Sequence, residues 1–161
     1  MSAPEPMDIV DIQVLQLPVR VWSRSQEQHD ALMREFALMS VPMEPGEKER
    51  HLPTRLMELI EQLNSDFEGV STEQEQSLEA AAAAGVETLD LVYQVPAAAA
   101  SASRALGEML DEADEYCRQG KHLLTLAADE ELVRFRWWFL DQFIHQADGK
   151  PPVAWPDYRR G

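Results

Sequence analysis

Cysteine and glycine-rich motifs are scarce in this chain, and each scarcity excludes a class of protein. The 161 residues include one cysteine, Cys117, so neither an intramolecular disulfide framework nor a zinc site built from several cysteines can form. The seven glycines are scattered singly, and neither GxGxxG nor GxxxxGK[ST] occurs, which removes the two common phosphate-binding loops. The alanine tracts at 80–84 and 97–100 are far shorter than the ~20 apolar residues of a membrane span.

Basic residues are also scarce. Fourteen Lys and Arg stand against 29 Asp and Glu, which gives a formal net charge of −15. Nucleic acids and anionic membranes are bound by basic surfaces, so this composition argues against a protein that coats either one. Residues 1–7 carry neither a basic start nor an apolar stretch, so we expect no secretory signal and a cytoplasmic protein.

The spacing of apolar residues predicts one mainly helical (α+β) domain at 9–158, with a disordered leader at 1–8 and a tail at 159–161. About five helices are expected to pack as a bundle around a minor two-stranded β element. The expected helices run from Ser23 or Ser25 to about Met39, from Pro53 to about Phe67, and over 72–84, 97–119 and 129–146.

Two segments, 11–21 and 88–95, have the alternation of strands. The first has a phase break near Leu15 and contains Pro18, which cannot donate to a ladder, so it is expected at an edge or at a bulge. A lone two-stranded ribbon is marginal in water. The strands must therefore pack on helices or extend a sheet across a homodimer, and the sequence leaves both open.

Candidate catalytic residues are few. None of the four histidines has a second histidine four positions later, so no HExxH zinc site exists, and we expect no metal or cofactor. Asp141 and His145 lie one helical turn apart and form either a surface pair or an acid–base pair. Cys117 is expected to be a core thiol, the alternative being a nucleophile served by His122.

Two segments of unusual composition are candidate interaction surfaces. Residues 108–115 hold five acids and no base, which indicates a solvated helix face or a docking surface for a basic partner. Residues 134–139 read Arg-Phe-Arg-Trp-Trp-Phe, and six consecutive helical residues cover the whole circumference of a helix. The string is either a buried helix whose arginines pair with the acidic helix, or an exposed Arg/Trp patch of the kind found at interface hot spots.

Several segments together resemble a family. They are Leu17–Trp22, Asp111–Gly120, Leu123–Ala127, Arg136–Phe143 and the closing Gly149–Pro156. On these residues the chain resembles small actinobacterial proteins associated with partner-switching systems, in which anti-sigma kinases, their antagonists and phosphatases control alternative sigma factors. The resemblance implies a regulatory context and transfers no catalytic residue.

These observations predict a non-enzymatic regulatory or adaptor protein that acts by protein–protein interaction, and the resemblance implies a place in sigma-factor or stress-type signalling. One alternative is a small-molecule sensor with an aromatic pocket between the last two helices, near Trp137 or Trp138. The other is an enzyme that uses Cys117 or the Asp141/His145 pair. A protein partner is expected, and the residues predicted to contact it are Arg134, Arg136, Trp138, Asp111, Glu112 and Glu115.

Overall fold

A computed structural model describes residues 8–39, 52–67, 69–119 and 128–159 of the chain. This part contains five α-helices and a two-stranded antiparallel sheet, which confirms the prediction of a mainly helical fold with a minor β element. Residues 1–7 of the predicted leader and 160–161 of the predicted tail lie outside it. The elements are β1 (Ile9–Pro18), α1 (Val19–Met39), α2 (Leu52–Asp66), α3 (Thr72–Ala84), β2 (Thr88–Pro96), α4 (Ala99–Arg118), α5 (Glu130–Ala147) and a short 3-10 helix, η1 (Trp155–Asp157).

The two strands pair with each other within the chain and pack on α5, while a homodimer stays a prediction. Their register runs from Ile9 opposite Pro96 to Pro18 opposite Thr88, and it shifts between Val14 and Leu17. This irregularity lies where the alternation predicted a phase break. Gln16 sits in the shift with a φ of 55°. An extra residue in one strand restores the inward direction of Leu17 after the break.

The first predicted strand, 11–21, is wrong at its end, because β1 stops at Pro18 and α1 begins at Val19. Val19 and Val21 are both buried in the main core, so the alternation of buried residues continues across the junction between strand and helix. Val19 and Val21 belong to the same buried cluster as residues of α3 and α5, whereas Arg20 between them is exposed. The predicted caps Ser23 and Ser25 therefore lie inside the helix.

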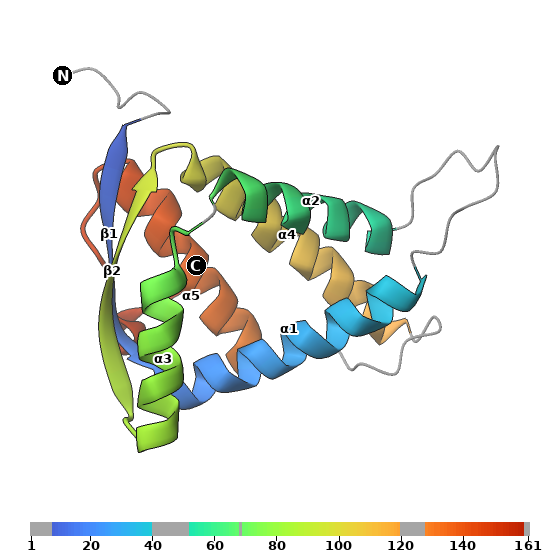
Figure 1. The fold of residues 1–161 in the computed structure, drawn as a ribbon, viewed down its shortest axis with the longest axis horizontal. Helices are drawn as coiled ribbons and strands as arrows, with labels where there is room; N and C mark the ends of the chain where they lie inside the picture. Colours follow the sequence, from blue (N-terminus) through green and yellow to red (C-terminus); the bar gives the residue numbers. More distant parts are fainter. Residues whose placement is uncertain (1–7, 40–51, 68, 120–127, 160–161) are drawn as a thin grey trace.

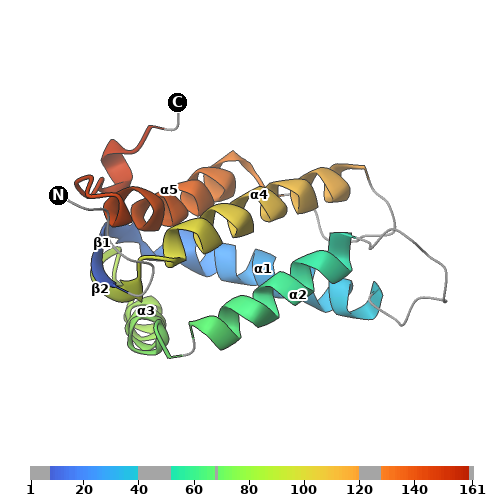
Figure 2. The same ribbon diagram turned by 90° about the horizontal axis from the view of Figure 1, so that it is seen from above.

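Figure 1 shows the sheet and α3 at one end of the molecule, with α1 along one side and α2 and α4 along the other. The buried face of the sheet packs on α5, and α5 also lies along α4 in both views (Figure 2). On β2 the inward side chains are Leu89, Leu91, Tyr93 and Val95, as the alternation predicted.

The buried apolar residues form two separate clusters. The larger one joins the sheet, α3, the start of α1 and α5, and Trp138 at its centre is fully buried. The smaller one, at the other end of the helices, is made of Leu32, Leu56, Ala113 and Cys117. The middle of the molecule, between these clusters, is less completely filled.

Helices α4 and α5 approach each other closely at Gly107. A Cβ atom added at Gly107 would lie 2.6 Å from Cη2 of Trp137, so this contact needs a glycine. Farther along, the segment after α5 folds back onto this helix. The Trp155 ring packs against the rings of Phe135 and Trp138, with centroids 5.9 and 5.5 Å apart.

Candidate functional site

The acidic helix α4 is joined to α5 by Arg136. Its two terminal nitrogens donate to Asp111 Oδ1 and Asp114 Oδ2, each at 2.7 Å, which confirms the expected pairing of this arginine with the acidic helix. Asp114 is only 3% exposed, and its other oxygen accepts a hydrogen bond from Ala128 N at 3.1 Å. Trp137 Nε1 also donates to Asp111. Arg136 thus has both of its carboxylate partners within the fold.

Arg134 does not pair with the acidic helix. Its Nη2 donates to the backbone oxygens of Trp155 and Tyr158, and its guanidinium lies 3.9 Å from the centroid of the Trp155 ring. Trp138 is 0% exposed and donates through Nε1 to Val153 O at 2.7 Å. Arg134 and Trp138 therefore hold the C-terminal segment, whereas Arg136 and Trp137 contact α4. Residues 134–139 form no exposed Arg/Trp patch.

The remaining predicted contact residues stay at the surface. Glu112 and Glu115 are exposed on α4 and form ion pairs of 3.3 Å with Arg55 and Arg118. The five acids at 108–115 thus divide into two groups. Asp111 and Asp114 serve the α4–α5 contact, and Glu108, Glu112 and Glu115 form an exposed acidic face.

Cys117 is a buried thiol in the smaller core cluster. Burial, aided by the negative charges of Asp114 and Glu35, raises its pKa to about 11, which disfavours the thiolate form needed by a nucleophile. Its proposed base, His122, lies outside the described residues.

Asp141 and His145 form the expected pair on α5, with Oδ1 of Asp141 3.5 Å from His145 Nε2. The other oxygen of Asp141 accepts a hydrogen bond of 2.6 Å from the Tyr158 hydroxyl. These side chains line a hollow of about 660 Å³ beneath the C-terminal segment. Tyr158 is buried, so it belongs to the folded domain.

The described part of the chain lacks both metal-binding clusters and membrane-spanning helices. Among the described residues, no three or more His, Cys, Asp or Glu side chains are grouped so as to hold a metal ion. Every helix in the described ranges is too short or too polar to cross a bilayer.

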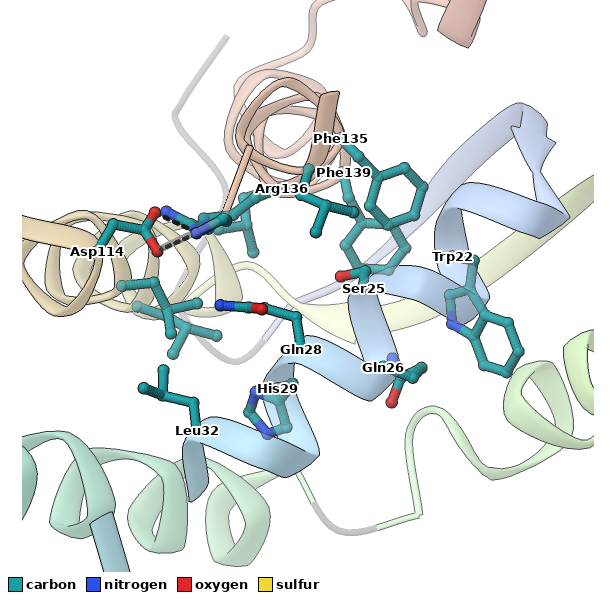
Figure 3. A pocket seen from close by; sticks show the side chains of 15 residues that line it. Trp22, Ser25, Gln26, Gln28, His29, Leu32, Asp114, Phe135, Arg136 and Phe139 are labelled. Carbon is teal, nitrogen blue, oxygen red and sulfur yellow. Dashed lines mark hydrogen bonds and ion pairs between the residues drawn. The ribbon is translucent and has the colours of Figure 1, made fainter. Parts of the chain in front are cut away.

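Two adjoining cavities occupy the space between the two core clusters. The smaller one, which we call the polar-edged cavity, has a volume of about 190 Å³ and lies between α1, α4 and α5. Phe135 and Phe139 reach it from α5, and the Arg136–Asp114 pair stands at its edge (Figure 3). From α1 it is lined by Trp22, Ser25, Gln26, Gln28, His29 and Leu32.

The second cavity, which we call the aromatic cavity, has a volume of about 470 Å³. It reaches from α4 and α5 to β2, to α3 and to the turn before α3, and it shares Trp22, Phe139 and three further residues with the polar-edged cavity. Its aromatic wall is made of Trp22, Phe67, Tyr93, Phe139 and Phe143.

Charge is distributed unevenly over these walls. Among the described residues that line the aromatic cavity, Glu75 is the one charged side chain. Burial, followed by the negative charge of Glu75, raises the pKa of Tyr93, so its hydroxyl stays protonated. In the polar-edged cavity, burial lowers the pKa of His29, so this imidazole is neutral at pH 7. Arg136, the cation of that cavity, is already paired with two carboxylates.

Sequence reasoning missed the residues that build these cavities. Trp22 lines both, whereas Trp137 packs below Gly107 and Trp138 lies in the larger core, so neither of the two expected tryptophans lines either cavity. The spacing of Trp22, Gln26 and His29 on one face of a helix was a usable signal. It was hidden because residues 19–21 read as strand.

The chain was also compared with known proteins, and it matches no protein-family model, no curated protein and no solved structure.

Proposed function

We propose that this chain is a regulatory protein that works by binding and not by catalysis, and that its aromatic cavity holds a small molecule. The observation that carries the proposal is the cavity itself, with a volume of about 470 Å³ and five aromatic side chains on its wall. Small-molecule sites are concave, mostly apolar and furnished with a few polar groups, which is the composition found here.

The position of the cavity supports a sensing role. It lies between the two core clusters, so its walls belong to α1, α4 and α5 at once. A ligand there contacts the elements whose packing links one cluster to the other. If the ligand binds one arrangement of these helices more tightly than another, its binding shifts the equilibrium toward the arrangement that it prefers.

A cavity-filling variant tests this function. Ala102 lines the aromatic cavity from α4, and Ala105 on the same helix is exposed, so Ala102→Phe and Ala105→Phe are a matched pair. The probe is the neutral dye N-phenyl-1-naphthylamine, whose fluorescence rises in apolar surroundings. We expect saturable one-site binding to the wild type and to Ala105→Phe, and none to Ala102→Phe. Equal binding by all three would contradict the proposal.

An adaptor role is the second candidate, and the exposed acidic face of Glu108, Glu112 and Glu115 supports it. These acids are exposed, and the ion pairs of Glu112 with Arg55 and of Glu115 with Arg118 lie in solvent, so a basic protein partner can compete for them. We propose that the chain contacts this partner in the cytoplasm, as part of sigma-factor or stress-type signalling, because of the family resemblance described above. Arg134, Arg136 and Trp138 then support the surface from inside and do not touch the partner.

Charge reversal separates the adaptor role from the sensor role. Glu112→Lys with Glu115→Lys should abolish co-purification of a partner from the native host, while Glu79→Lys on exposed α3 should leave it unchanged. A partner retained by the reversed variant would remove this surface from the account. The mass of the isolated chain in solution tests the predicted homodimer in the same preparation.

A further inference from the structure

The wall of the aromatic cavity combines five aromatic side chains with one negative charge. Trp22, Tyr93 and Phe143 approach it from α1, β2 and α5, so aromatic rings lie on several sides of the same space. Glu75 stands on its wall from the first turn of α3, where its Oε1 accepts a hydrogen bond from Ser71 Oγ at 3.2 Å. No described residue on this wall carries a positive charge.

This combination discriminates between ligands by charge. The faces of aromatic rings carry negative potential and attract cations, an effect worth more when the cation is removed from water. An anion would meet the same faces and the Glu75 carboxylate with nothing to compensate its charge. The negative charge of Glu75 acts on another residue of the cavity wall, because it contributes, after burial, to the raised pKa of Tyr93.

On the basis of the function proposed above, we infer that the ligand of the aromatic cavity is an organic cation, a protonated or quaternary amine with an apolar body. The ammonium group lies against the aromatic rings on the side of Glu75. The apolar body extends toward Leu106 and Leu140, which also line the polar-edged cavity. The volume of about 470 Å³ falls within the range of cavities that enclose such molecules.

The inference is tested with three benzyl compounds, of which the first two have the same shape. Benzyltrimethylammonium is a cation, neopentylbenzene replaces its nitrogen by carbon and is neutral, and phenylacetate is an anion. Affinities are measured by ligand-observed NMR for the wild type and for Glu75→Gln. Glu73→Gln is the matched control, because Glu73 lies in the same first turn of α3 and does not line the aromatic cavity.

We expect the wild type to bind the cation at least about tenfold more tightly than the neutral probe, and not to bind the anion. Glu75→Gln should lower the affinity for the cation about tenfold and leave the affinity for the neutral probe unchanged. Glu73→Gln should bind all three probes as the wild type does. Because Glu75 is exposed, the substitution keeps the fold. If the neutral probe binds as tightly as the cation, and Ala102→Phe blocks it, the cation inference is overturned while the binding function stands. If no probe binds to the wild type more tightly than to Ala102→Phe, both the cation inference and the binding function are overturned.

Discussion

Gln146 binds the peptide groups of Gln13 as a neighbouring strand would. Its Oε1 accepts from Gln13 N and its Nε2 donates to Gln13 O, both at 2.8 Å. Opposite Gln13 in the register is Val92, whose carbonyl oxygen accepts from Gln74 Nε2 at 2.7 Å. Both outer edges of the two-stranded sheet are thus occupied, at the same level, by side-chain amides from α5 and α3.

Removing the amide of Gln146 should expose the outer edge of β1. We expect Gln146→Leu to reduce the free energy of unfolding by about 1–2 kcal/mol, because two hydrogen bonds to Gln13 are lost. The freed edge should also promote association between copies of the chain. Denaturant unfolding and sedimentation measure the two effects, with Gln76→Leu on exposed α3 as the control for an added surface leucine. Identical behaviour of the two variants would refute the edge role.

Gly107 should tolerate no side chain while Trp137 is present. We expect Gly107→Ala to destabilise the protein by about 1–3 kcal/mol, because the new Cβ meets the indole ring at 2.6 Å. In a Trp137→Leu background the same substitution should stabilise by up to about 1 kcal/mol, as alanine is the better helix former. A double-mutant cycle measured by chemical denaturation checks this change of sign. A cost that stays the same in both backgrounds would mean that the contact does not limit the position.

Acidic residues on α4 should differ sharply in their effect on stability. Asp114→Ala should cost about 3 kcal/mol, because it leaves the largely buried Arg136 without one of its partners. Glu112→Ala should cost less than about 1 kcal/mol, since its pair with Arg55 is exposed. Thermal and denaturant unfolding of the two variants compare them directly. Equal losses would contradict the division of the acids into an internal and an external group.

Asp129 should make stability depend on pH in the acid range. It caps α5 by accepting from Leu132 N at 3.0 Å, and this bond, aided by Arg24, lowers its pKa below the ordinary 3.8. The unfolded chain therefore binds a proton more readily than the folded one, so this stabilisation is complete above pH 3.8 and is lost as the pH falls through the lower folded pKa.

The corresponding variants are Asp129→Ala and Asp129→Asn. At pH 7 the alanine variant should lose about 1 kcal/mol, the typical value of an N-cap. Asparagine also caps helices but does not titrate, so the difference in unfolding free energy between the wild type and Asp129→Asn should shrink as the pH falls below 3.8. A difference that is constant with pH would show that the carboxylate is not the titrating group.

Much of the fold could be predicted because the apolar spacing of each long segment agrees with its surroundings. β2 was found because Leu91, Tyr93 and Val95 all point into one core. The end of β1 could not be found, because burial on two sides of a helix start produces the same alternation as a strand. Val19 and Val21 are the case in point.

The candidate site was predictable only in part. The ion pair of Arg136 with the acidic helix could be predicted, because the chain has few basic residues and many acidic ones, five of them on that helix. The different fate of Arg134 depends on where the chain after α5 returns, which no local pattern determines. The aromatic cavity collects residues from six elements and a turn, so its wall exists only after the fold has formed.

The indole N–H signals of the four tryptophans provide the most direct test of the ligand cavity. In a ¹H–¹⁵N correlation spectrum, each indole gives one peak, which Trp-to-Phe variants assign. Addition of benzyltrimethylammonium or of N-phenyl-1-naphthylamine should shift the Trp22 peak in a saturable way and leave those of Trp137 and Trp138 in place, because Trp22 alone among these three lines the aromatic cavity. Shifts at Trp137 or Trp138 with Trp22 unmoved would contradict the account.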